Sequence, residues 1–178
     1  MIAFCLGLLT GGALMAAGLL VVGSLSRIVL PLWTRPTLVG LFGVAVLLRE
    51  YGLIRFTMPE NRRLVPESVF RLGRFFGPYQ FGIEMGTGAR TYLPTGLPYA
   101  VALAVMLVAS PIAALAAGLG FGLGRTVTIV ANLRYDRVNG WDRMWRAEHH
   151  VVKMLLTVGF TVALASAVVL AAGWRIPA

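Results

Sequence analysis

The sequence predicts an all-α protein, a polytopic transmembrane helix bundle with about five spans. Three stretches carry no charged side chain: the first 26 residues, residues 101–124 and residues 154–174. A hydrocarbon core of ~30 Å takes about 20 apolar residues of helix to cross, because each backbone polar group must bond within the segment. Charged residues make up 13% of the chain, against roughly 25% in an average soluble domain. The 178 residues, 1–178, are therefore expected to form a single integral membrane domain.

The first two spans are expected at about residues 1–23 and 37–54. No basic residue precedes Arg27, whereas a secretory signal begins with a basic region. The first run is therefore interpreted as a retained helix, with a cleaved signal as the alternative. The link between the two spans contains Leu-Pro-Leu-Trp at 30–33, and tryptophan favours the headgroup level. Adjacent charges at 49–50 limit where the second span leaves the hydrocarbon.

Residues 81–98 interrupt the regular pattern. This stretch holds four glycines and two prolines, too many for one straight helix. The remaining spans are expected at about residues 97–110, 112–132 and 154–173, with a tight turn at Pro111 between the first two. The 97–110 span is shorter than a full crossing requires. Part of the interrupted stretch is therefore expected at membrane depth, where it can add a re-entrant half-helix.

The positions of lysine and arginine give the orientation. The two basic links, residues 55–90 and 134–153, hold six and five such residues, whereas the opposite side holds Arg27, Arg35 and Arg175. Basic residues accumulate in cytoplasmic loops, where they also meet anionic lipid. The sequence therefore predicts a bacterial plasma membrane protein with a cytoplasmic N-terminus and an external C-terminus. This distribution also accounts for the net charge of +9, so no nucleic-acid partner is expected.

Four alternating glycines mark the fourth span, just before Arg125. They are Gly118, Gly120, Gly122 and Gly124, which form two pairs with a spacing of four residues. Small residues at this spacing let helix backbones approach closely in a membrane, and these four are expected to do so together on one side. The strand-turn-helix context of a dinucleotide-binding loop is absent. The sequence therefore predicts a helix-packing interface, with another span of this chain or with another subunit.

Polar residues near the interrupted stretch form a candidate substrate or ion path: Glu84, Thr87, Arg90 and Arg125. A charged group at membrane depth costs ~2.5–3.5 kcal/mol on insertion scales, so it tends to pair or to face a cavity. Transporters place interrupted helices at substrate sites, because free carbonyls and helix ends bind polar groups there. The hypothesis is an ion pair of Glu84 with an arginine, or a proton-accepting carboxylate. The alternative is that the charged groups are ordinary anchors at the cytoplasmic interface.

The glycine-, threonine- and proline-containing stretch 81–98, the helix after it and residues 118–125 resemble the small CcdA/DsbD-type membrane proteins of the LysE superfamily. Residues 4–11 and 81–88 also match at Phe, Thr and Gly with a spacing of 77, which would suit two related halves. The resemblance implies inverted repeats, broken helices, and movement of reducing equivalents or small solutes across the membrane. The redox members of that family need a cysteine in each half. This chain has only Cys5, so the resemblance implies a solute-moving or degenerate relative.

Two functions are expected from these observations. The first is an accessory, non-catalytic membrane subunit that packs against a larger membrane protein complex. The alternative is a small solute transporter of CcdA/LysE-like type with a site around Glu84 and Arg90. No nucleophile has an evident base, no P-loop is present, and the adjacent His149 and His150 lack metal-ligand spacing. No catalytic residue, metal or cofactor is therefore expected. A membrane enzyme is the third possibility, and it would require Glu84 or the pair His149 and His150 to lie in a closed polar pocket. The expected partners are the lipid bilayer and another membrane protein or a second copy of the chain.

Overall fold

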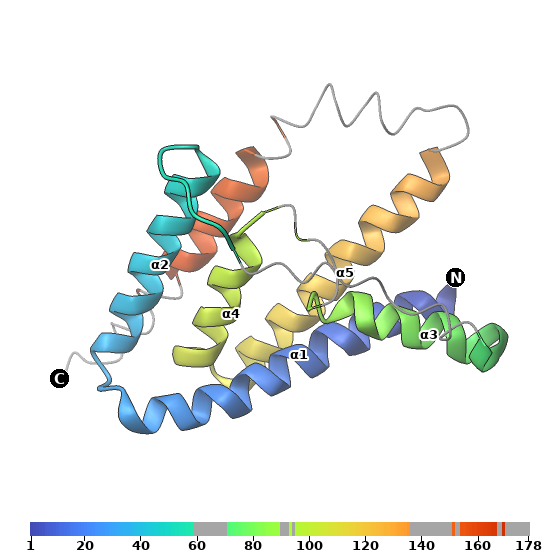
Figure 1. The fold of residues 1–178 in the computed structure, drawn as a ribbon, viewed down its shortest axis with the longest axis horizontal. Helices are drawn as coiled ribbons and strands as arrows, with labels where there is room; N and C mark the ends of the chain where they lie inside the picture. Colours follow the sequence, from blue (N-terminus) through green and yellow to red (C-terminus); the bar gives the residue numbers. More distant parts are fainter. Residues whose placement is uncertain are drawn as a thin grey trace.

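The computed structural model describes residues 1–58, 71–89, 93, 95–135, 151, 154–166 and 169. Within these residues every regular element is a helix, which confirms the all-α class. In chain order the helices are α1 (Ile2–Val29), α2 (Thr34–Glu50), α3 (Gly73–Gly86), α4 (Leu97–Leu107), α5 (Pro111–Tyr135) and a last helix, Met154–Ser166 (Figure 1). Arg90, His149 and His150 lie outside the described residues.

Two of the described helices are long and apolar enough to cross a membrane. They are Ile2–Val29 and the Pro111–Ala131 part of α5, while Leu97–Leu107 and Met154–Ser166 are apolar but shorter. Large apolar side chains on both long helices face outward, for example Ile28 and Ile112. Extended apolar surface of this kind is typical of contact with lipid or with another protein. The described residues therefore show two candidate spans, and five spans remain a prediction.

Helix α1 continues beyond the expected end of the first span at residue 23. The serine hydroxyls at 24 and 26 donate to carbonyl oxygens of the preceding turn of the same helix. These bonds satisfy the hydroxyls inside the helix, so the polar residues do not end it. The turn between α1 and α2 is therefore confined to residues 30–33, where Leu32 and Trp33 are both exposed.

Helices α1 and α3 pack backbone against backbone through glycines. A Cβ added to Gly7 would lie 2.9 Å from the Cα of Gly82, and a Cβ added to Gly11 would lie 2.9 Å from the Cα of Gly86. Real Cβ atoms essentially never approach so closely. Each helix thus presents two glycines four residues apart, the pattern that allows close approach of helices in membranes. The two helices run parallel, because the contacting residue numbers rise together.

The close contact with α1 also explains why α3 runs unbroken through residues 81–86, where the sequence predicted an interruption. Isolated glycines are weak helix formers, but a glycine that contacts a second backbone gains packing that no larger residue allows. The rings of Phe4 and Phe81 stack with centroids 5.6 Å apart, and the Tyr79 hydroxyl donates to Thr10 Oγ1 at 3.2 Å. The two matching segments, 4–11 and 81–88, therefore lie side by side.

Helix α1 is the centre of the fold, since α3, α4 and α5 all contact it. Helix α5 runs antiparallel to it: a Cβ on Gly118 would lie 2.9 Å from the carbonyl carbon of Gly12, and a Cβ on Gly122 would lie 2.9 Å from the Cα of Leu9. Farther along α1, Gly23 meets the backbone of Met106 at the end of α4. In Figure 1, α3 lies along the N-terminal part of α1, α5 crosses α1, and one end of α4 comes close to it.

A second cluster joins α2, α4 and the last helix. Its buried members are Val46, Leu97 and Ala100, and Phe160 of the last helix packs against them. Gly43 of α2 is in direct contact with the Leu164 side chain. The described helices are thus arranged as two groups that share α4, one centred on α1 and one on α2.

Candidate functional site

The structure brings three of the predicted path residues to the end of α3. Glu84 lies in the last turn of the helix, and Thr87 is the residue that follows it. The Thr87 hydroxyl donates to the Glu84 carbonyl oxygen at 2.8 Å. Arg125 comes from α5, and its Nη1 donates to the Met85 carbonyl oxygen at 2.8 Å. Arg90, the fourth residue of the hypothesis, lies outside the described residues.

Arg125 has the geometry of a helix-capping group. The last carbonyls of a helix have no partner within the helix and carry partial negative charge, so a cation at this position is favourable. The guanidinium also lies over the Phe121 ring, 5.1 Å from its centroid, which fixes its direction. Arg125 therefore ties the end of α3 to α5. Because Gly86 packs against Leu8 and Gly11, α3 ends well inside the length of α1.

The four alternating glycines of α5 face two opposite sides. Gly118 and Gly122 contact α1, whereas a Cβ on Gly120 or Gly124 would have no described atom within 4 Å. The expectation that the four act together on one side is therefore wrong. Residues two apart on a helix are separated by about 200°, so pairs offset by two residues point away from each other. One pair packs within the chain, and the other faces outward.

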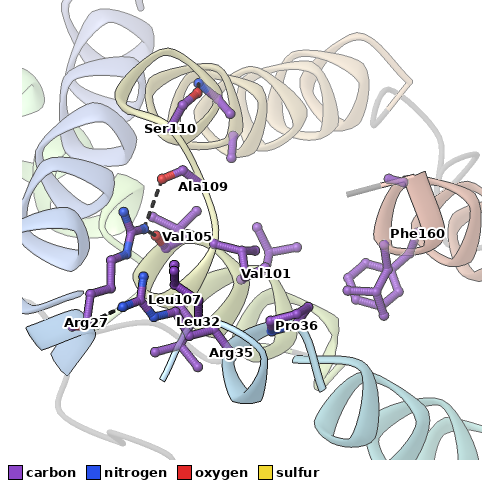
Figure 2. Close-up of a pocket in the computed structure, with 16 residues that line it drawn as sticks. Arg27, Leu32, Arg35, Pro36, Val101, Val105, Leu107, Ala109, Ser110 and Phe160 are labelled. Atoms are coloured by element: carbon purple, nitrogen blue, oxygen red, sulfur yellow. Dashed lines mark hydrogen bonds between the residues drawn. The ribbon is translucent and has the colours of Figure 1, made fainter. Parts of the chain in front are cut away.

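The sequence did not predict the pocket that the structure shows between the α1–α2 turn, α4, α5 and the last helix (Figure 2). Its volume is about 920 Å³, and its lining is mainly aliphatic and aromatic. The polar side chains in the lining are Arg27, Arg35 and Ser110. Ligand pockets of this size are usually apolar with a few convergent polar groups.

Arg27 closes one end of the pocket by capping α4. Its Nε donates to the Met106 carbonyl at 2.8 Å, and its Nη2 donates to the carbonyls of Val105 at 2.8 Å and Ala109 at 2.9 Å. Arg35 caps the end of α1 in a similar way. It donates hydrogen bonds to the carbonyl oxygens of Leu30 and Arg27. In the sequence, the only sign of these capping contacts is that Arg27 and Arg35 flank a mostly apolar run and have no acidic residue nearby.

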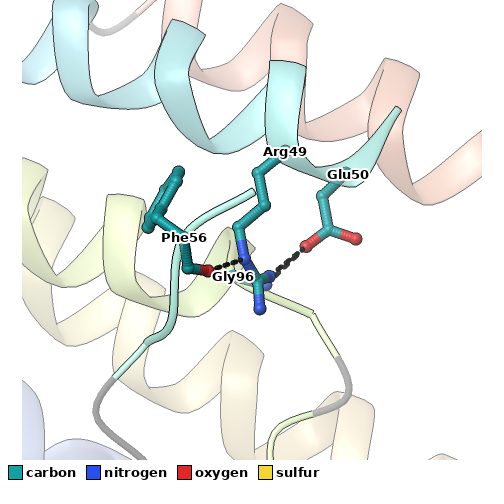
Figure 3. Close-up of polar contacts among 4 residues, drawn as sticks. All are labelled: Arg49, Glu50, Phe56 and Gly96. Atoms are coloured by element: carbon teal, nitrogen blue, oxygen red, sulfur yellow. Dashed lines mark hydrogen bonds and ion pairs between the residues drawn. The ribbon is translucent and has the colours of Figure 1, made fainter. Parts of the chain in front are cut away.

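A polar link at the opposite end of α4 holds that helix to α2 (Figure 3). Glu50 Oε1 accepts the backbone N–H of Gly96 at 2.8 Å, immediately before the first turn of α4. The same oxygen pairs with Arg49 at 3.2 Å, and Arg49 Nε donates to the Phe56 carbonyl at 2.9 Å. A carboxylate at a helix N-terminus is favourable because the first N–H groups lack partners there. Both ends of α4 are therefore held by charged side chains from other helices.

Comparisons with models of protein families, with curated proteins and with solved structures give no match for this chain. The described residues form an all-α protein with two helices long and apolar enough to cross a membrane. A pocket lies between its helices. Among the described residues, no three His, Cys, Asp or Glu side chains are grouped as metal ligands. The features of the described residues that indicate a function are the helix packing, the pocket and the end of α3.

Proposed function

We propose that the chain is a five-span integral membrane protein of the bacterial plasma membrane, and that it acts as a non-catalytic accessory subunit of a larger membrane complex. The outward face of α5 is the observation that supports this role. Ala116, Gly120 and Gly124 are exposed at four-residue spacing on the side of α5 away from α1. Helices in lipid associate through such small residues, which allow a partner backbone to approach closely.

The large side chains beside this face favour a protein partner. Leu123 and Val127 are both more than half exposed and border the small residues on the same helix. They lie three residues after Gly120 and Gly124, so they form one raised edge along the small residues, against which a second helix can pack. The opposite face of α5 contacts α1 through the same spacing of glycines, so the chain already contains one example of the packing proposed here.

The positions of the described turns support the proposed orientation. Arg27 at the end of α1 bonds to Ala109 in the turn between α4 and α5, so these two turns lie at one end of the fold. The end of α2 and the start of α4 meet elsewhere, through Glu50 and Gly96. Turns at alternate ends suit successive crossings. The side assigned to each end follows from the basic links, which place the N-terminus and both links in the cytoplasm and the C-terminus outside.

Replacing Gly120 by leucine should weaken association with the partner by about tenfold or more, because a large side chain keeps the partner backbone away from the small residues of α5. The fold of the chain itself should survive, since no described atom lies within 4 Å of the new Cβ. The measurement is native mass spectrometry of the full chain purified from its own membranes in mild detergent, with the stoichiometric partner identified by sequence.

The matched control is Gly18→Leu, another substitution of a glycine with open space around its Cβ, on α1. This variant should keep both its thermal stability and the complex. If Gly120→Leu retains the same complex at the same abundance, α5 is not the docking face.

The end of α3 supports a second candidate function, a small solute transporter of the CcdA/LysE-like type with a site around Glu84 and Arg90. Helix α3 ends at Gly86, which packs against Leu8 and Gly11 of α1. Gly88, two residues later, has a φ of 70°, which turns the chain away from the helix axis. A helix that ends inside a membrane presents carbonyl groups to polar solutes. Arg125 brings a positive charge to the same place.

If this second function holds, Glu84→Gln should reduce solute-dependent proton flux by about tenfold or more, because the amide cannot exchange a proton. The assay uses liposomes that contain the full chain and a trapped pH-sensitive dye, with a panel of amino acids and inorganic ions as solutes. Glu84→Asp, which keeps an ionisable carboxylate at the same position, is the matched control and should keep the flux. Equal flux in wild-type and empty liposomes for every solute would rule out the proton-coupled transporter.

A further inference from the structure

We infer that the pocket between the α1–α2 turn, α4, α5 and the last helix binds one anionic glycerophospholipid, with its phosphate at Arg27 and Arg35 and an acyl chain along the apolar wall. The inference uses the membrane placement of the proposed function but not the docking face of α5. It starts from an imbalance of charge. The pocket lining contains two guanidinium groups and no carboxylate.

Both arginines keep donors for a ligand. Arg27 uses Nε and Nη2 for carbonyl oxygens, and Arg35 also uses Nε and Nη2. Among the described residues, the Nη1 group of each therefore has no hydrogen-bond partner. Figure 2 shows the two guanidinium groups on the same side of the pocket. Backbone carbonyls hold both guanidinium groups in place, and the remaining N–H groups can donate hydrogen bonds to the oxygens of one phosphate.

The rest of the pocket suits a hydrocarbon chain rather than a free anion. Its wall beyond the arginines includes Val101, Val105 and Phe160. Burying such surface against an acyl chain is favourable, whereas a free phosphate would leave it in contact with water. Basic pockets between transmembrane helices are a known mode of binding for anionic lipid headgroups.

The depth of the pocket also fits a lipid. The α1–α2 turn carries Leu32 and Trp33, both exposed, and Trp33 is two residues before Arg35. Tryptophan prefers the headgroup level of a bilayer. The arginines thus lie at the height of lipid phosphates, and the apolar wall extends from there along α4 and the last helix.

The test is native mass spectrometry of the full chain titrated with phosphatidylglycerol, and with phosphatidylcholine of the same chain length. The wild-type protein should retain one phosphatidylglycerol in preference to phosphatidylcholine. Arg35→Gln should weaken this binding about fivefold or more, as expected for the loss of one arginine near a phosphate. Arg55→Gln, which removes an equal charge at an exposed site outside the pocket, should not change it.

A second pair of variants tests the acyl chain. Ala163 lines the pocket, whereas Ala165 on the same helix does not, and both are exposed. Ala163→Phe should displace the lipid and Ala165→Phe should not. Equal loss in Arg35→Gln and Arg55→Gln, no loss in Ala163→Phe, or equal binding of inorganic phosphate would each overturn the lipid site. The membrane placement is tested separately by mixing the purified wild-type chain with lipid nanodiscs. Failure of the chain to enter them would contradict that placement.

Discussion

Substitution of Gly82 by leucine should prevent stable folding of the chain. A Cβ at this position would clash with the carbonyl oxygen of Phe4 and would lie 3.0 Å from the Cα of Gly7. Both obstacles are backbone atoms of α1, which cannot rotate away as a side chain can. Overpacking usually costs about 1–3 kcal/mol, and a clash between two helix backbones belongs at or above the upper end of that range. Thermal unfolding in detergent, followed through the fluorescence of the four tryptophans, measures the loss.

The control for this prediction is Gly40→Leu in α2, where an added Cβ meets no described atom within 4 Å. It should unfold near the wild-type temperature. Gly82→Ala should lie between the two, because it adds only the first clashing atom. Similar unfolding temperatures for Gly82→Leu and Gly40→Leu would show that α1 and α3 do not pack through their glycines.

Replacement of Arg27 by glutamine is expected to have the second largest effect. The substitution removes three hydrogen bonds, of 2.8, 2.8 and 2.9 Å, to carbonyl oxygens at the end of α4. Hydrogen bonds to charged groups contribute about 1.5–3 kcal/mol each, and three from one side chain are not additive, so a loss of about 3 kcal/mol is expected. Because α4 meets α1 at this end, the same thermal unfolding measurement detects the loss.

Arg27→Lys separates the charge from the geometry. A single ammonium keeps the positive charge but cannot reproduce the fork that reaches three carbonyls, so this variant should recover only part of the stability. Arg55→Gln controls for the change in net charge at an exposed position. Full recovery in Arg27→Lys would mean that only the charge matters.

The sequence predicts the helical elements well, because their signals are local. The charge-free runs place α1 and α5, and the glycine spacing in α5 indicates close packing. The sequence failed at α3, where glycines were taken as breaks in the helix. Their effect depends on what lies opposite, and the contact between Gly82 and Gly7 is a tertiary feature that local propensity does not contain.

The candidate site was predictable only in part for the same reason. Arg125 was identified from its charge beside an apolar run, but its Nη1 donates to the carbonyl oxygen of Met85 on another helix. In the sequence, Arg27 indicates only which side of the membrane the first turn faces. The carbonyl oxygens that it caps at the end of α4 are 78–82 residues away. Backbone carbonyls are present at every residue, so no pattern of side chains distinguishes the ones that an arginine will cap.

The central position of α1 has a consequence for how the protein is made. The ribosome completes α1 long before its partners exist, since Gly82 follows Gly7 by 75 residues. At about 5–20 residues per second, the first helix waits at least several seconds before α3 can cover its glycines. In the proposed membrane placement, Gly7 and Gly11 of α1 are accessible to other helices during that interval. Under that placement, the insertion machinery or the surrounding lipids would keep α1 unpaired until α3, α4 and α5 are made.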